Sequence, residues 1–201
     1  MLFTKKNLSL FLFLLTTVLY FGCDSSKNAV GGTTASQNLA PKKMETGGTI
    51  TFAAASNRYS ANGEFKSWHF TKMDVKTNKA SEIKSIDAAI EIDITSIWEK
   101  SDKLTNHLKA PDFFNIAQFT TATMDINNVK KQSDGTYTVD MKLNMKGLTQ
   151  DMTSTFTVTN TNPLHVKGTA LVNRNLFSLG KVKMKVPEMI EVTYDTDLPQ
   201  S

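Results

Sequence analysis

Cysteine is almost absent from this chain of 201 residues, since Cys23 is the only one. No disulfide can form within the chain and no zinc site can be built from cysteines, so the fold must be stabilised by its core alone. The three histidines, His69, His107 and His165, lie far apart and show no metal-ligand spacing. We therefore expect no metal site.

Sequence motifs of common enzymes are also missing. The chain has no Gly-x-Ser-x-Gly motif, no His-Glu-x-x-His motif and no phosphate-binding loop. Asp87, Glu91 and Asp93 lie on the polar face of one expected strand, where water would solvate them, so they do not suggest a tuned acid–base pair. These absences predict no catalytic residue and no cofactor, and they favour a binding or interaction protein.

A strong charge of one sign is lacking as well. The formal net charge is +4, and Lys5 and Lys6 near the N-terminus contribute two of those charges. So small a basic excess does not predict a nucleic-acid partner.

The longest apolar run lies at the N-terminus, where Leu8 to Phe21 follow Lys5 and Lys6. A basic start, a short apolar core and a small residue are typical of a secretory signal, and the run is short for a membrane span. Residues 19–23, Leu-Tyr-Phe-Gly-Cys, resemble a bacterial lipobox, whose cysteine is acylated before the signal is removed. The alternative is an ordinary secreted protein in which Cys23 has no such role.

We accordingly expect residues 1–22 to be a lipoprotein signal peptide and Cys23 to be the site of lipid attachment. The protein would be an exported bacterial lipoprotein, anchored by lipid on the periplasmic side of the inner or outer membrane. Residues 23–46 are rich in Ser, Thr, Gly, Asn and Lys and are predicted to be a flexible tether with a reach on the order of 25 Å. Residues 47–201 then form one domain, large enough to bury roughly 70% of its unfolded surface.

From Gly48 onward, alternation of apolar and polar residues predicts β-strands. Ile86–Ile94 and Tyr137–Met145 alternate most strictly, and turns are expected at Ser133–Gly135 and Lys146–Gly147. Further strands are expected around Ile50 and Phe52, Trp68 and Phe70, Ala122–Ile126, Met152–Val158, Leu164–Val172, Val182–Val186 and Ile190–Tyr194. Phe65 is out of phase with the next aromatic residues, which predicts a bulge or bend after Asn62-Gly63.

One interruption of the strand pattern is helical. Ser96 is expected to cap a segment over residues 97–108 that has one apolar face. A short second turn from Pro111 carries Phe113 and Phe114.

About eight strands with one apolar face each predict an all-β fold, an antiparallel barrel with a short helical insertion. A barrel of about eight strands is just wide enough to be filled by side chains or to hold one slender ligand. The alternation does not distinguish a filled interior from a hollow one, nor a barrel from a sandwich.

Four short motifs follow one another between Ile90 and Gly180. Residues 92–97 end a strand in Ser-Ile, residues 107–114 read His-Leu-Lys-Ala-Pro-Asp-Phe-Phe, residues 137–149 form a hairpin, and residues 172–177 contain Asn-Arg-Asn. In order and spacing they resemble the YceI family of exported bacterial proteins. These proteins have a lipocalin-like barrel, and several bind polyisoprenoid chains.

The resemblance implies an eight-stranded antiparallel lipocalin-like β-barrel. It also implies that the interior binds a polyisoprenoid, or a similar isoprenoid or quinone amphiphile, for carriage, storage or sensing. The candidate ligand-binding residues are Trp68, Phe70, Ile90, Ile92, Phe113, Phe114, Met124, Tyr137, Met141, Met145 and Phe156. Thioether side chains adapt well to an irregular apolar chain, although methionine is an ordinary core residue too.

His107, Asp112 and Arg174 are candidates for a headgroup-binding mouth. The alternatives are that His107 caps a helix end or packs at the surface, and that Arg174 bonds to loop carbonyls or to Asp112. Phe113 and Phe114 would either gate the barrel or plug its end.

A second function hypothesis is a solid barrel that binds no small molecule and docks a protein partner through its outer face or loops. The resemblance is compatible with a homodimer, although nothing in the strand pattern requires one.

Overall fold

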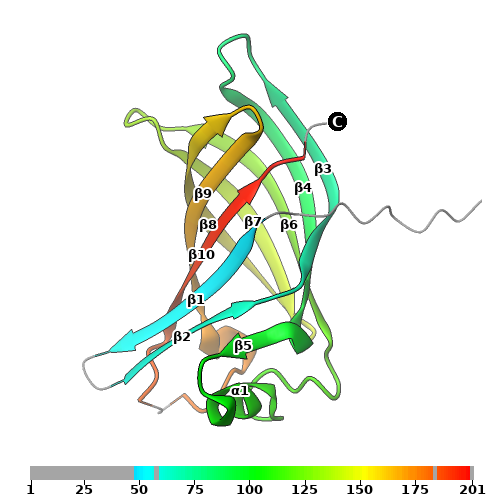
Figure 1. The fold of residues 1–201 in the computed structure, drawn as a ribbon, viewed down its shortest axis with the longest axis vertical. Helices are drawn as coiled ribbons and strands as arrows, with labels where there is room; N and C mark the ends of the chain where they lie inside the picture. Colours follow the sequence, from blue (N-terminus) through cyan, green and yellow to red (C-terminus); the bar gives the residue numbers. More distant parts are fainter. Residues whose placement is uncertain (1–47, 57–58, 183–184, 200–201) are drawn as a thin grey trace, which may run out of the picture. The chain divides into compact units, whose positions relative to one another are not determined.

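The computed structural model describes residues 48–56, 59–182 and 185–199, and these form an antiparallel β-barrel domain with one α-helix (Figure 1). The strands are β1 (Thr49–Ser56), β2 (Tyr59–Phe65), β3 (Trp68–Thr77), β4 (Ile83–Asp93), β5 (Ile97–Glu99), β6 (Thr121–Lys131), β7 (Tyr137–Met145), β8 (Leu148–Thr161), β9 (Leu164–Asn173) and β10 (Met189–Asp197). The helix is α1 (Asp102–Lys109), and two short 3₁₀ helices are η1 (Ile94–Ser96) and η2 (Arg174–Phe177).

All of these strands belong to one sheet, in the order β3-β4-β6-β7-β8-β9-β10-β1-β2-β5. Every neighbouring pair is antiparallel, and the sheet curls around a common interior (Figure 1). Within the described part of the chain, β3 and β5 are the edges of the sheet. The predicted all-β, lipocalin-like architecture is confirmed, with ten strands in place of about eight.

The strict alternation along β7 shows why the sheet curls. Val139, Met141 and Leu143 are buried, whereas Asp140 and Lys142 between them are exposed. Side chains of a strand point alternately to its two faces, so each such strand has one face that must be shielded from water. Curling the sheet turns all of these apolar faces toward one interior.

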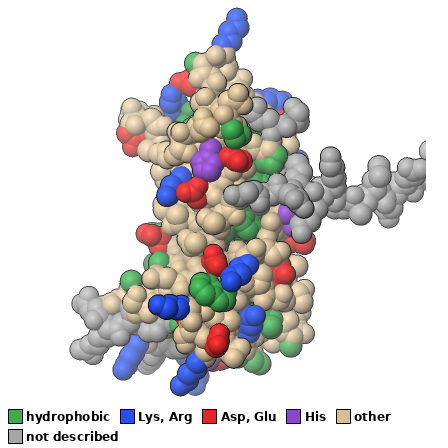
Figure 2. Space-filling view, in the orientation of Figure 1, with side chains coloured by type: hydrophobic (Ala, Val, Ile, Leu, Met, Phe, Trp, Pro, Cys, Tyr) green, Lys and Arg blue, Asp and Glu red, His purple; other side chains and the backbone are tan. Residues whose placement is uncertain are grey.

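The outer face of the barrel carries charged side chains of both signs (Figure 2). Lys72 pairs with Asp87 at 2.5 Å and Lys142 with Asp151 at 3.7 Å, and all four side chains are more than half exposed. Exposed ion pairs contribute little to stability, so the apolar interior has to stabilise the fold.

The two predicted hairpin turns are present. Lys146 and Gly147 both have positive φ angles, 54° and 73°, as the two central residues of a type I′ turn require. This turn joins β7 to β8 and places Lys146 at the end of the barrel near α1. Gly135, with φ 88°, lies in the turn between β6 and β7.

The strand expected at Val182–Val186 is not formed in the described part of that segment. The reason is the side chain of Arg174. Its guanidinium donates hydrogen bonds to the carbonyls of Lys181, Val186 and Pro187. These carbonyls are therefore engaged by a side chain and not by a neighbouring strand.

Phe65 is out of phase with Trp68 because the chain changes strands between them. β2 pairs with β1 and β5, whereas β3 pairs with β4. The bend is thus at residues 66–67 and not directly after Asn62-Gly63. A register shift in this region lies further on, between Phe70 and Lys72.

The helix begins later than the sequence pattern suggests. Ser101, not Ser96, is the N-cap of α1, and its hydroxyl accepts a hydrogen bond from the Leu104 N–H at 3.3 Å. The Ser96 hydroxyl donates to the Asp93 carbonyl at 2.6 Å and accepts from the Ser67 N–H at 3.0 Å. It therefore belongs to η1.

Within the described residues, no helix is both long enough and apolar enough to span a bilayer. The predicted signal peptide, Cys23 and the predicted tether all lie outside the described residues and stay predictions.

His165 on β9 links to β10 through two carboxylates. Its Nδ1 lies 2.6 Å from Asp197 Oδ1 and its Nε2 lies 2.6 Å from Asp195 Oδ1. These hydrogen bonds, the one to Asp197 first, raise the pKa of His165 above its ordinary value of 6.5.

We predict a pH-dependent contribution of His165 to stability. Because the pKa of His165 is higher in the folded than in the unfolded chain, its protonated form stabilises the fold. This contribution is fully present below the unfolded pKa of 6.5 and disappears as the pH rises through the folded pKa. Thermal unfolding of the protein and of His165→Gln, measured from weakly acidic to weakly alkaline pH, should show a difference in melting temperature that shrinks with rising pH. A constant difference would contradict the prediction.

Candidate functional site

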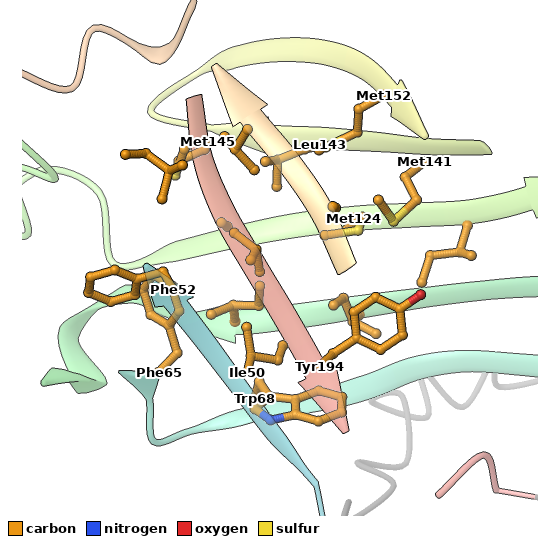
Figure 3. Close-up of a pocket in the computed structure, with 18 of the residues that line it drawn as sticks. Ile50, Phe52, Phe65, Trp68, Met124, Met141, Leu143, Met145, Met152 and Tyr194 are labelled. Atoms are coloured by element: carbon orange, nitrogen blue, oxygen red, sulfur yellow. The ribbon is translucent and has the colours of Figure 1, made fainter. Parts of the chain in front are cut away.

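The barrel encloses a cavity of about 200 Å³. Every strand except β5 contributes to its wall, together with α1 and the turn that follows α1. Figure 3 shows wall residues converging on the cavity from strands that are distant in the sequence, among them Phe52, Trp68 and Met145. For comparison, an apolar cavity of about 150 Å³ is large enough to bind benzene.

Small side chains in the wall leave this space open. The alanines that line the cavity are Ala54, Ala61, Ala88, Ala122 and Ala170. At Gly168, an added Cβ would lie only 2.3 Å from the Tyr194 hydroxyl oxygen, so glycine is required for that ring to lie against β9.

Most of the predicted ligand-binding residues line this cavity. They are Trp68, Phe70, Ile90, Ile92, Phe113, Phe114, Met124, Met141, Met145 and Phe156. Their contact with a ligand stays a prediction. Tyr137 is the exception: it is buried but does not line the cavity, because its ring stacks on Phe156 with centroids 5.2 Å apart.

The sequence reasoning missed several wall residues on the same inward faces. Phe65 and Met73 line the cavity, as do Tyr194 and Leu198 near the C-terminus. Met152 lies on the same face of β8 as Phe156 and also lines the cavity. Phe65 was not predicted to face the interior, because the chain changes strands directly after it and Phe65 is out of phase with Trp68.

The polar side chains of the wall already have protein partners. The Trp68 indole donates to the Gly48 carbonyl at 3.3 Å, and the Thr196 hydroxyl donates to the Asp197 carbonyl at 3.2 Å. The Tyr194 hydroxyl lies 2.8 Å from the Ser154 hydroxyl, and burial raises the pKa of Tyr194 to about 12, so it is neutral.

The described wall residues include no Asp, Glu, His or Lys. Nor do the described residues elsewhere bring together three or more His, Cys, Asp or Glu side chains that could hold a metal ion. The chemistry that the cavity wall mainly offers is therefore apolar contact, which suits a hydrocarbon.

Arg174 is the one cation among the described wall residues, and its guanidinium is bonded to the chain. The residue is only 1% exposed, and its nitrogens donate to the carbonyls of Leu179, Lys181, Val186 and Pro187 at 2.8–3.2 Å. The predicted headgroup role is not supported for Arg174, since these bonds use most of its donors. The loop-carbonyl alternative describes its geometry.

The other two predicted mouth residues lie on the surface. His107 and Asp112 are both exposed. The His107 ring packs edge-on against Phe113 with centroids 4.7 Å apart. The structure does not place these two side chains in the cavity wall, so a headgroup role for them stays a prediction.

An apolar cluster lies at the end of the barrel beside α1. Ile94, Ile97, Leu108, Phe113 and Phe114 form part of one buried cluster there. Of these, all but Ile97 line the cavity, and the burial of Phe113 and Phe114 in this cluster is compatible with the plug alternative.

Lys146 fastens this end from outside. Its ammonium donates to the Phe113 carbonyl and, at 2.9 Å, to the Ser178 carbonyl. The Gly180 N–H donates to the Asp112 carbonyl at 2.7 Å. Burial lowers the pKa of Lys146, which is the expected cost of using a charged group in this position.

Comparison with known proteins identifies the family. Residues 40–198 match the model of the YceI-like domain. The chain belongs to the YceI-like family. A comparison with curated protein sequences finds no match.

Solved structures of other bacterial proteins share the fold. BcnA of Burkholderia cenocepacia superposes with a TM-score of 0.64 at 19% identity, covering 74% of this chain and 94% of BcnA. The YceI protein of Campylobacter jejuni gives 0.57 at 16% identity, covering 73% and 88%. A polyisoprenoid binding domain from Saccharophagus degradans, implicated in plant cell wall breakdown, gives 0.51 at 13% identity, covering 78% and 97%.

We predict that Arg174→Met destabilises this YceI-like domain by about 3 kcal/mol or more, because four carbonyls lose their donor. Lys142→Met, which removes an exposed cation from β7, should change stability by no more than about 0.5 kcal/mol. Denaturant unfolding of both variants measures the difference. Equal stabilities would mean that the guanidinium does not hold the 179–187 segment.

Proposed function

We propose that this protein binds the hydrocarbon chain of an isoprenoid, or of a similar isoprenoid or quinone amphiphile, inside its barrel. It carries, stores or senses that lipid and performs no covalent chemistry. The single observation that carries this proposal is the apolar cavity, whose polar wall groups are already bonded within the protein. A solid barrel that only docks proteins would have no use for such a space.

Burial of apolar surface is sufficient to bind such a ligand. Each buried CH₂ contributes roughly 0.8 kcal/mol, so a short chain gains affinity without hydrogen bonds. Methionines on four different strands, Met73, Met124, Met141 and Met152, line the space and adapt their thioether side chains to an irregular chain. Membership of the YceI-like family and the polyisoprenoid binding domain from Saccharophagus degradans support the isoprenoid class.

The same proposal includes a membrane anchor. Cys23, acylated after export, holds the domain by lipid on the periplasmic side of a membrane, at the end of a tether over residues 23–46. The barrel then works beside the bilayer from which an amphiphile is taken.

Filling the cavity should abolish binding. Ala88 on β4 is 2% exposed and faces the cavity, whereas its neighbour Ala89 lies on the outer face of the same strand. We predict that Ala88→Phe weakens farnesol binding by about tenfold or more, because the ring occupies the ligand's space. Isothermal titration of the full chain with Cys23→Ser provides the measurement.

Ala89→Phe is the matched control and should bind farnesol like the parent. Melting temperatures show whether both variants are folded. A folded Ala88→Phe variant with unchanged affinity would contradict an interior site.

The anchor has its own test. Expressed in a bacterium that processes lipoproteins, the unmodified chain should partition with membranes, and its N-terminal peptide should carry acyl chains on Cys23 in mass spectra. Cys23→Ser should lose both properties. A Cys23→Ser protein that stays in the membrane fraction would contradict anchoring by this residue.

A further inference from the structure

Two aromatic rings line the cavity beside α1. Phe113 and Phe114 are 6% and 8% exposed, and both line the cavity together with Leu108. They follow one another in a turn, so one short segment presents two large side chains to the same end of the space. The inference drawn from them rests on the proposed function, since it concerns the chain that the cavity would hold.

The backbone that carries these rings is held at several points. The Phe113 N–H donates to the Ala110 carbonyl at 3.0 Å, and the Phe114 N–H donates to the Leu108 carbonyl at 3.0 Å. From outside, Lys146 bonds to the Phe113 carbonyl and the Gly180 N–H to the Asp112 carbonyl. The segment is therefore tied to α1, to the β7–β8 turn and to the segment after η2.

The rings themselves are braced by their neighbours. Phe114 meets Phe65 edge-on with centroids 5.8 Å apart, and Phe65 lies 5.8 Å from Phe52. Phe177 of the same buried cluster is 2% exposed and does not line the cavity. In an interior packed to the density of a crystal, such rings cannot move aside without disturbing the layer they pack against.

Lys146 and Arg174 are not free to bind a polar headgroup at this end. The ammonium of Lys146 and the guanidinium of Arg174 are already bonded to backbone carbonyls. Burying a polar group without a partner is costly, so the apolar end of an amphiphile is the part that fits here.

We propose that Phe113 and Phe114 form a stop that limits the length of the hydrocarbon chain the barrel accepts. The chain lies with its apolar end against the two rings and its headgroup directed away from α1. Additional carbon atoms then collide with the rings, because both rings line the cavity and are braced by the residues packed around them. The selected ligand is a short-chain amphiphile.

The test is a series of isoprenoid alcohols of increasing length: geraniol, farnesol and geranylgeraniol. Each is titrated into the full chain carrying Cys23→Ser and followed by Trp68 fluorescence, since Trp68 lines the cavity. We expect the affinity to stop rising, or to fall, at the longest alcohol. Phe114→Ala should raise the affinity for geranylgeraniol by about tenfold and change that for geraniol much less.

Phe177→Ala is the matched control, because it removes an equally large ring from the same buried cluster without enlarging the lined cavity. It should keep the parent's preference for chain length. Phe114→Leu provides a second, milder variant whose shift should have the same direction if Phe114→Ala does not fold.

The outcomes separate the stop from the proposed function. Affinities that rise steadily with chain length in the parent, or an identical shift in the Phe114 and Phe177 variants, would overturn the stop while leaving chain binding intact. Failure of the folded parent to bind any of the three alcohols would overturn the proposed function, and the stop with it.

Discussion

The one-sided apolar face of each long strand is the constraint on which the rest of the structure depends. Along β4 and β7, every inward position holds an apolar side chain. In a flat sheet, the face that carries these side chains would be exposed to water. Curling shields that face and brings residues from nine strands to one interior. Alanines such as Ala88, Ala122 and Ala170 are too small to fill it, and a cavity is left.

Polar side chains hold the backbone together at one end of the cavity, and those in the cavity wall are bonded within the protein. The buried guanidinium of Arg174 gathers four carbonyls of the 179–187 segment, and the ammonium of Lys146 joins the turn after α1 to the segment after η2. With these groups bonded to the backbone, the interior presents hydrocarbon, aromatic and thioether surface. Polar groups thus hold the backbone at one end, and apolar side chains line the cavity. This arrangement suits the non-covalent binding of a lipid chain.

The local strand pattern was predictable from the sequence, whereas features set by distant residues were not. Alternation along Tyr137–Met145 placed Met141 and Met145 on the inner face, and most of the predicted ligand-binding residues do line the cavity. The segment Val182–Val186 alternates as well, but Arg174 on η2 takes the carbonyl of Val186 and that of Lys181 just before the segment. The alternation of apolar and polar residues does not show whether inward side chains touch across the barrel. The presence of a cavity could therefore be seen only in the three-dimensional structure.

Native mass spectrometry with organic extraction, on the full chain carrying Cys23→Ser and purified from an exporting bacterium, tests the central claim most directly. Removing the acylation site keeps covalent acyl chains from being mistaken for cargo. A hollow lipid-binding barrel predicts a stoichiometric, non-covalent isoprenoid or quinone that is released into the organic phase. A mass equal to that of the polypeptide alone, unshifted after incubation with prenyl lipids, would contradict it.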